Sequence, residues 1–142
     1  DIEEAGLVIE AVFEDMQVKC DVLKALDQAA PRAVLASNTS YLDIDIMAGC
    51  LSDPSRLVGL HFFSPAHIMK LLEIVKGVQT SDYALATGYA LAKHLRKIPV
   101  EVGVCDGFVG NRMLQRVREA AELLLLDGAE PVQIDRAMRG FG

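Results

Sequence analysis

The chain has 142 residues, of which 51% are hydrophobic and 24% are charged, and its formal net charge is −6 at pH 7. This composition is typical of one globular domain with a real core, and it excludes the basic face of a general nucleic-acid binder. No apolar run approaches the roughly 20 residues of a membrane-spanning helix. The acidic start and the missing initial Met lead us to expect a piece of a longer protein rather than a leader peptide.

The number and spacing of the three cysteines do not predict a disulfide or a metal site. Cys20, Cys50 and Cys105 are odd in number and show no C-x-x-C spacing, which favours neither a disulfide framework nor a zinc site. We therefore expect reduced thiols in a cytoplasm-like compartment, and no metal.

The first half of the chain alternates strand and helix patterns. A nearly continuous apolar run at residues 6–13 predicts a strand buried on both faces. Apolar residues at helical spacing over residues 14–30, followed by Pro31, predict a helix. Two further buried strands are predicted at residues 33–37 and 57–63.

A short helix is predicted between the second and third strands. Ser40 and Asp43 lie three residues apart in a capping-box pattern that would begin this helix, and Gly49 would end it. The order strand, helix, strand, helix, strand predicts half of a doubly wound α/β sheet.

The second half adds two strands and then becomes helical. Residues 71–75 predict a fourth strand, and residues 99–104 predict a fifth that lies near an edge because of Pro99. Between them, Ser81 would cap an amphipathic helix over residues 81–97.

From Asp106, a candidate cap, the pattern is helical until Asp127-Gly128, and another helix begins near Gln133. Leu123 to Leu126 make the first of these helices apolar almost all round, so we expect another domain or a partner to cover it.

The segment from His61 to Glu73 carries the densest chemistry. His61 ends a buried strand, where open α/β sheets place their ligands, and a bend at residues 64–66 would return Glu73 beside it. A carboxylate on one imidazole nitrogen fixes the tautomer and leaves the other nitrogen to accept a substrate proton. On these two residues alone, a strand-end histidine and a surface carboxylate remain the simpler interpretation.

Other candidates are weaker on their own. Ser40 follows a buried strand, and a helix cap is its simplest role, one that is compatible with a ligand contact as well. Asn111 and Arg112 add an amide and a cation at a helix start, and a capped helix start is the simpler explanation. On the same reasoning, Glu14 and Lys19 are predicted to be ordinary surface charges. No G-x-G-x-x-G occurs, so the phosphate-binding turn of a complete dinucleotide fold is missing from this sequence.

Five sequence motifs favour a functional interpretation of these candidate residues. They are Leu-Val-Ile-Glu-Ala-Val-Phe-Glu-Asp (7–15), Ala-Ser-Asn-Thr-Ser (36–40), Gly-Leu-His-Phe-Phe-Ser-Pro-Ala-His (59–67), Met-Lys-Leu-Leu-Glu (69–73) and Asp-Gly-Phe-Val-Gly-Asn-Arg (106–112). In order and spacing they resemble the 3-hydroxyacyl-CoA dehydrogenase family, and the resemblance covers essentially the whole chain. Residues 64–67 are more similar to the multifunctional fatty-acid oxidation enzymes than to members with Asn-Pro there.

The resemblance implies roles residue by residue. His61 would be the general base that takes the 3-hydroxyl proton, and Glu73 would stabilise its imidazolium. To complete the catalytic set, Asn111 would bond to the substrate or orient the catalytic pair, and Ser40 would contact the region of the substrate hydroxyl. The implied contacts to NAD are Ala11, Glu14, Lys19, Ser40 and Ser64, the last replacing an Asn of other members, and the implied contacts to substrate are Ser40, Asn111 and Arg112, the last near the CoA phosphates.

The resemblance also implies an organisation. Residues 1–104 would be the C-terminal half of a Rossmann-type NAD-binding domain, and residues 105–142 the start of an all-α substrate and dimerisation domain. The whole enzyme would oxidise an acyl-CoA thioester in β-oxidation, as a homodimer or within a multifunctional chain. It would lie in the cytoplasm of a bacterium or in the mitochondria or peroxisomes of a eukaryote.

The alternatives are a non-catalytic relative, such as a crystallin-like structural protein, and an inactive fragment. For the 142 residues alone we expect no NAD binding and no catalysis, because the Gly-rich turn is not among them. We also expect self-association, because the edge of the first strand and the apolar helix around Leu123 to Leu126 would be left uncovered.

Overall fold

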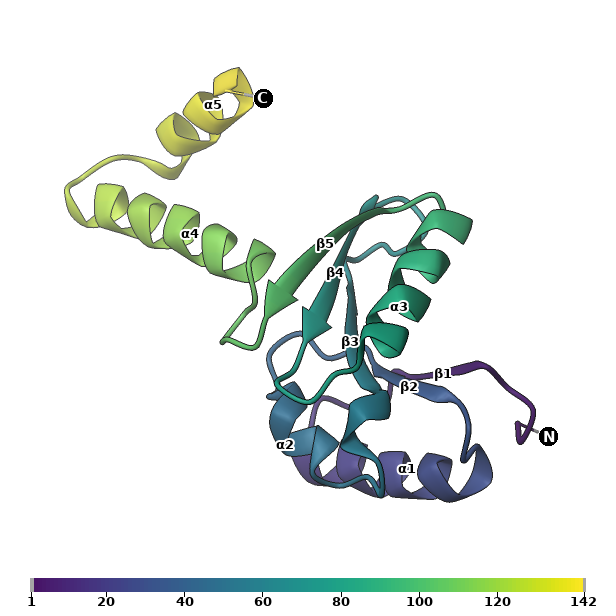
Figure 1. Ribbon diagram of the computed structural model, residues 1–142. Coiled ribbons are helices and arrows are strands. Elements are labelled where there is room, and N and C mark those ends of the chain that lie inside the picture. Colours follow the sequence, from purple (N-terminus) through teal and green to yellow (C-terminus); the bar gives the residue numbers. More distant parts are fainter. Residues whose placement is uncertain (1, 142) are drawn as a thin grey trace. The chain divides into compact units, whose positions relative to one another are not determined.

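Five strands form one sheet in the order β1-β2-β3-β4-β5 (Figure 1). They are β1 (Leu7–Glu10), β2 (Val34–Ser37), β3 (Leu57–Phe62), β4 (Leu71–Lys76) and β5 (Ile98–Gly103). Neighbouring strands are parallel except β3 and β4, which are antiparallel. The computed structural model describes residues 2–141, which divide into a unit that ends at Phe108 and a unit that begins at Val109.

Helices cover both faces of the sheet (Figure 1). The helices are α1 (Met16–Ala29), α2 (Ile44–Ala48) and α3 (Asp82–His94), and a 3-10 turn η1 (Pro54–Arg56) leads into β3. Side chains alternate along each strand, so that Leu35 packs in the core under α1 and α2, and Val34 packs in the core under α3. This arrangement confirms the predicted doubly wound α/β class.

Gly59 lets α2 approach the sheet closely. A Cβ on Gly59 would lie 2.6 Å from Cβ of Val75 and 3.1 Å from Cδ1 of Ile44. Any side chain there would push β4 or α2 away from the centre of β3. The close approach holds β3, the strand that carries His61, against both neighbours.

Two details of the first strand differ from the prediction. β1 ends at Glu10 rather than Phe13, and Ile9 is 40% exposed rather than buried. The expectation of burial on both faces was wrong because β1 lies at an edge of this sheet and pairs with β2 alone among the described strands.

Two predicted helix caps were also wrong. Asp43, not Ser40, caps α2, because its carboxylate accepts from the backbone N–H groups of Asp45 and Ile46 at 2.8 and 3.2 Å. Asp106 does not cap the helix that follows it, which begins after Val109 without a side-chain cap. A left-handed turn separates Asp106 from that helix.

The second unit consists of two helices. They are α4 (Gly110–Leu126) and α5 (Pro131–Phe141), separated by Gly128 at a φ of +98°. Apolar side chains of α4 are exposed, with Leu126 at 83%. No helix among residues 2–141 combines the length and the hydropathy that crossing a membrane requires.

A disulfide joins Cys20 of α1 to Cys50, which lies just after α2, with their Cα atoms 5.8 Å apart. The expectation that all thiols are reduced was therefore wrong, and Cys105 remains a free thiol. The two cysteines are 30 residues apart in sequence and meet because α1 and α2 pack beside each other. Cysteine spacing carries no information about such a helix contact.

Candidate active site

His61 and Glu73 form a buried pair on adjacent strands. The antiparallel register of β3 and β4 sets them directly opposite each other. Nδ1 of His61 lies 2.7 Å from Oε2 of Glu73, and the two side chains are 5% and 1% exposed. With Nδ1 held by a carboxylate, Nε2 is the nitrogen that can accept a proton. The predicted return of the chain at residues 64–66 thus brings the two side chains together.

Two aromatic rings pack beside the imidazole of His61. The ring centroids of Phe63 and Phe108 lie 4.5 and 5.6 Å from that of His61. Phe108 is 1% exposed, and Gly107 and Phe108 have φ values of 67° and 47°. A bulky residue at positive φ is costly, and such residues gather at functional sites. No role for Phe108 was predicted from the sequence.

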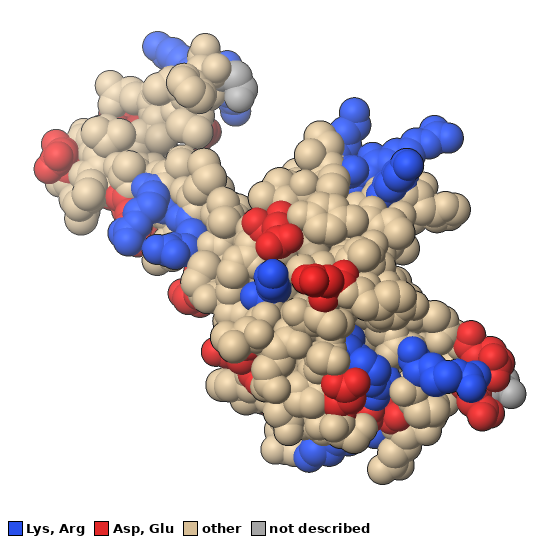
Figure 2. All heavy atoms as spheres, viewed as in Figure 1, with Lys and Arg blue, Asp and Glu red and all other residues tan. Residues whose placement is uncertain are grey.

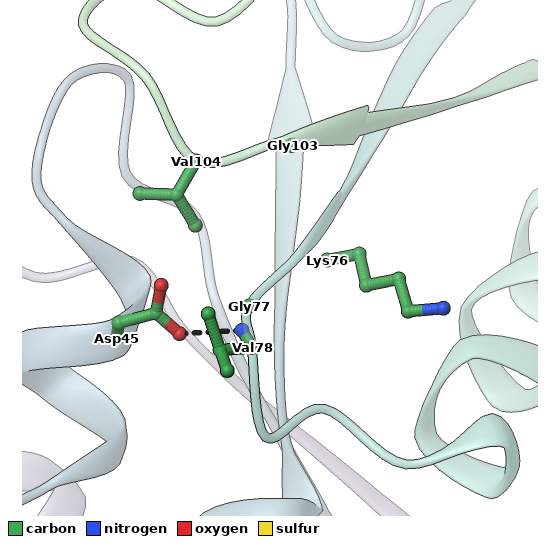
Figure 3. Close-up of a pocket in the computed structure, with 6 residues that line it drawn as sticks. All are labelled: Asp45, Lys76, Gly77, Val78, Gly103 and Val104. Carbon is green, nitrogen blue, oxygen red and sulfur yellow. Dashed lines mark hydrogen bonds between the residues drawn. The ribbon is translucent and has the colours of Figure 1, made fainter.

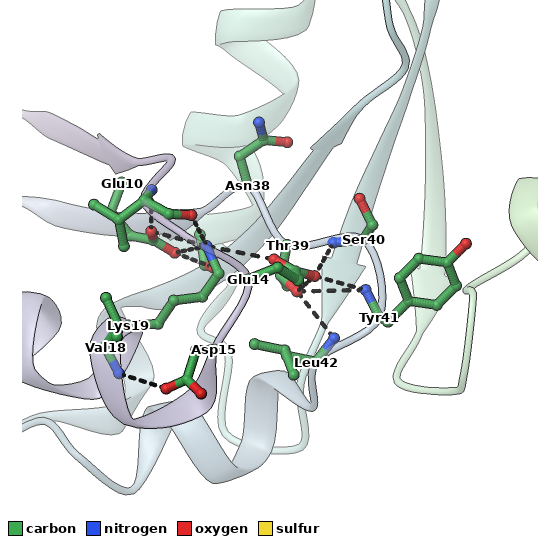
Figure 4. A network of polar contacts seen from close by, with 12 residues as sticks. Glu10, Glu14, Asp15, Val18, Lys19, Asn38, Thr39, Ser40, Tyr41 and Leu42 are labelled. Atoms are coloured by element: carbon green, nitrogen blue, oxygen red, sulfur yellow. Dashed lines mark hydrogen bonds and ion pairs between the residues drawn. The ribbon is translucent and has the colours of Figure 1, made fainter.

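A second buried cluster lies at the carboxyl ends of β1 and β2 (Figure 4). Nζ of Lys19 is 3.0 Å from both carboxylate oxygens of Glu10 and donates to the Val12 carbonyl at 3.2 Å. Ser37 donates its hydroxyl to the same Glu10 carboxylate. The Lys19 side chain is 0% exposed, so its interpretation as a surface charge was wrong. Glu10 was missed because it looks like one polar residue in an apolar run.

Glu14 joins this cluster to the turn after β2. Its Oε1 accepts from the Thr39 hydroxyl at 2.6 Å and from the backbone N–H groups of Ser40 and Tyr41 at 2.8 and 3.2 Å. Its Oε2 lies 3.6 Å from Nζ of Lys19.

Burial acts to raise the pKa of Glu14, but these hydrogen bonds and the Lys19 charge outweigh it and hold the pKa below its usual value of 4.5. Glu14 is therefore a fixed carboxylate at neutral pH.

Ser40 lies at this turn with its backbone bound to Glu14 and its side chain pointing away from Glu14 (Figure 4). Two residues before Ser40, the side-chain oxygen of Asn38 accepts from the backbone N–H of Phe62 at 3.2 Å and so joins the ends of β2 and β3. Because Phe62 follows His61, this hydrogen bond joins the turn that carries Ser40 to the strand that carries His61.

The other residues predicted for the site lie just after strands or in the second unit. Ala11 is exposed just after β1, and Ser64 is exposed just after β3. Asn111 and Arg112 lie in the first turn of α4, which belongs to the other unit. Their assignment to the site stays a prediction.

A separate hollow lies at the carboxyl ends of β4 and β5 (Figure 3). Its one carboxylate, Asp45, accepts from the backbone N–H of Val78 at 2.7 Å, and a Cβ on Gly77 would lie 2.6 Å from Oδ1 of Asp45. Lys76 points away from this carboxylate in Figure 3. Asp45 therefore holds a turn, and the hollow offers no paired groups for chemistry.

Comparisons with known proteins agree with one another. The family described as "3-hydroxyacyl-CoA dehydrogenase, NAD binding domain" matches residues 1–105. The peroxisomal bifunctional enzyme of Danio rerio is 50% identical over 143 residues, covering 100% of this chain and 20% of that protein. The fatty acid oxidation complex subunit alpha of Psychrobacter sp. is 44% identical over 143 residues, again 100% of this chain and 20% of that protein.

A solved structure agrees as well. The (S)-3-hydroxybutyryl-CoA dehydrogenase of Ralstonia eutropha is 38% identical with a TM-score of 0.92, covering 97% of this chain and 50% of that one. The chain spans about a fifth of the length of the curated relatives it matches.

Proposed function

The chain belongs to the 3-hydroxyacyl-CoA dehydrogenase family, and on that premise we propose that it is part of an NAD-dependent enzyme of fatty-acid β-oxidation. This enzyme oxidises the 3-hydroxyl of an (S)-3-hydroxyacyl-CoA to a ketone. The observation that carries the proposal is the buried His61–Glu73 pair, with Nδ1 and Oε2 2.7 Å apart. A non-catalytic, crystallin-like relative would not need a buried pair with this geometry, which favours the enzyme.

His61 acts as the general base. Its Nε2 takes the proton of the 3-hydroxyl, because Nδ1 is held by Glu73. The imidazolium that forms is stabilised by the adjacent carboxylate, and the rings of Phe63 and Phe108 exclude water from it. Bound NAD would accept the hydride that leaves C3, the carbon that carries this hydroxyl.

The cluster at the ends of β1 and β2 suits the nicotinamide end of NAD. The Glu14 side chain is 36% exposed and carries a fixed carboxylate, which accepts hydrogen bonds from ribose hydroxyls. Ser40 adds an outward hydroxyl, and the exposed Ala11 and Ser64 line the same strand ends. Because Lys19 is completely buried, we assign it to hold Glu14 rather than to touch the cofactor.

The second unit contributes to the substrate side of the proposal. In this unit Asn111 contacts the substrate and Arg112 binds a CoA phosphate. In the first unit, Ser40 contacts the region of the 3-hydroxyl. Residues 1–104 then belong to the NAD-binding domain, and residues 105–142 begin the helical domain.

We propose that the chain works within a multifunctional protein, as its relatives' names suggest, or as a homodimer. Its compartment would be the peroxisome or mitochondrion in a eukaryote and the cytoplasm in a bacterium.

Glu73→Gln tests the proposed chemistry. In the full-length protein, assayed with (S)-3-hydroxybutyryl-CoA and NAD, this change should lower kcat by about 10²-fold with KM little changed. The amide keeps the shape of the side chain but removes the charge that stabilises the imidazolium.

Glu101→Gln is the matched control, because Glu101 is an exposed glutamate on the adjoining strand β5, opposite Ile74. An active wild-type protein whose kcat is unaffected by Glu73→Gln would exclude Glu73 from the reaction. A wild-type protein without turnover would favour the crystallin-like alternative.

Arg112→Ala tests the proposed phosphate contact. A guanidinium can bind a phosphate in bidentate fashion, so KM for the acyl-CoA should rise by about tenfold, and by less at high salt. An acyl-pantetheine substrate, which lacks the nucleotide phosphates of CoA, should be nearly unaffected. Equal losses with both substrates would contradict the contact, and the exposed Arg116 on the same helix provides a control as Arg116→Ala.

A further inference from the structure

Lys97, in the turn between α3 and β5, makes two contacts to the connection between β3 and β4. Its Nζ donates to the carbonyl oxygens of Ala66 and Met69 at 2.6 and 2.7 Å. The same ammonium lies 5.8 Å from the ring centroid of Phe62, the residue after His61. One cation thus touches both the end of the catalytic strand and the segment that leaves it.

The end of α3 fixes the position of Lys97. Arg96 has a φ of 55°, its N–H donates to the Lys93 carbonyl at 3.1 Å, and the Lys97 N–H donates to the Ala92 carbonyl at 2.9 Å. These two bonds around one left-handed residue form a Schellman motif, which ends a helix at a defined point. The next residue continues the contact, because the Ile98 N–H donates to the Lys70 carbonyl at 2.8 Å.

The segment held by Lys97 has little packing of its own. Residues 64–70 are exposed, and the N–H groups of Ile68 and Met69 both donate to the Pro65 carbonyl at 3.0 Å. Such local bonds shape the segment without attaching it to the core. The charged hydrogen bonds from Lys97 attach it to α3, and hydrogen bonds from an ionised donor are stronger than neutral ones.

We propose that Lys97 is a positioning residue of the dehydrogenase site, which holds residues 64–70 so that Ser64 stays in place at the cofactor end. This inference rests on the proposed function. The sheet ladder between β3 and β4 holds His61 and Glu73 independently of Lys97. Loss of Lys97 therefore weakens cofactor binding much more than it slows the chemical step.

The test compares Lys97→Met and Lys97→Arg in the full-length protein. Methionine keeps the apolar stem against Phe62 and removes the donors, whereas arginine keeps donors and charge. Lys97→Met should raise KM for NAD by about tenfold while kcat stays within about twofold, and amide hydrogen exchange over residues 66–70 should become faster. Lys97→Arg should restore both properties.

Lys93→Met is the matched control. Basic side chains gather over this end of α3 in Figure 2. Lys93 is an exposed residue in the last turn of the same helix. Unchanged exchange in Lys97→Met, or faster exchange with an unchanged KM, would overturn the positioning role. An inactive wild-type protein would overturn the proposed function instead, and the exchange comparison would still decide whether Lys97 holds residues 64–70.

Discussion

Replacing His61 with glutamine in the full-length protein should lower kcat by at least about 10²-fold and leave KM for the acyl-CoA little changed. Glutamine can still bond to Glu73, so the buried carboxylate is not left without a neighbour. It has no nitrogen that can take up a proton at neutral pH, and the substrate hydroxyl then loses its base. Steady-state kinetics with (S)-3-hydroxybutyryl-CoA and NAD measure both constants.

His94→Gln is the control for this experiment. His94 is exposed at the end of α3 and lies outside the buried pair. Turnover near the wild-type rate in His61→Gln would contradict the assignment of His61 as the base, whereas an equal loss in His94→Gln would point to a general effect on folding.

Glu10→Gln should destabilise the unit that ends at Phe108 by about 3–5 kcal/mol. The side chains of Lys19 and Glu10 are 0% and 1% exposed, so this change leaves a buried ammonium without its nearest carboxylate. Glu14 lies 3.6 Å from Nζ, farther than the 3.0 Å of Glu10, and is only partial compensation. Native-state hydrogen exchange of the β1 and β2 amides measures this free energy for the unit alone.

The double variant Glu10→Gln/Lys19→Met separates the cost of an unpaired charge from the cost of a lost contact. It should be less destabilised than Glu10→Gln, because both charges are gone. Glu4→Gln is the control, since Glu4 pairs with Arg32 at the surface and should have no measurable effect. A double variant as unstable as the sum of the two single variants would show that Glu10 and Lys19 do not act as a pair.

Most of the local structure could be predicted from the sequence. The five strands lie at the apolar runs that predicted them, although β1 ends at Glu10 rather than Phe13. Ser81 caps α3 as expected by accepting from the Ala84 N–H at 3.2 Å. Such features depend on residues within one turn or one strand of each other. The wrong cap at Ser40 has the same origin, because Asp43 is an equally good local acceptor and lies closer to the helix.

The candidate site was only partly predictable. His61 and Glu73 were identified together because one bend joins their strands, so their separation in sequence is short. Phe108 was missed because it reaches His61 from a different part of the chain, through a left-handed turn. The same applies to Glu10, whose burial depends on where α1 places Lys19.

The sequence by itself determined the order of strands and helices, the α/β class and the family, because periodicity and motif order are properties of neighbouring residues. The tertiary structure alone decided that Lys19 is buried against Glu10, that Cys20 meets Cys50 and that Lys97 reaches the carbonyls of residues 66 and 69. These contacts join segments that are distant in the chain, and they form only when the helices pack on the sheet. Distance in space is a property of that packing, and no local pattern in the sequence encodes it.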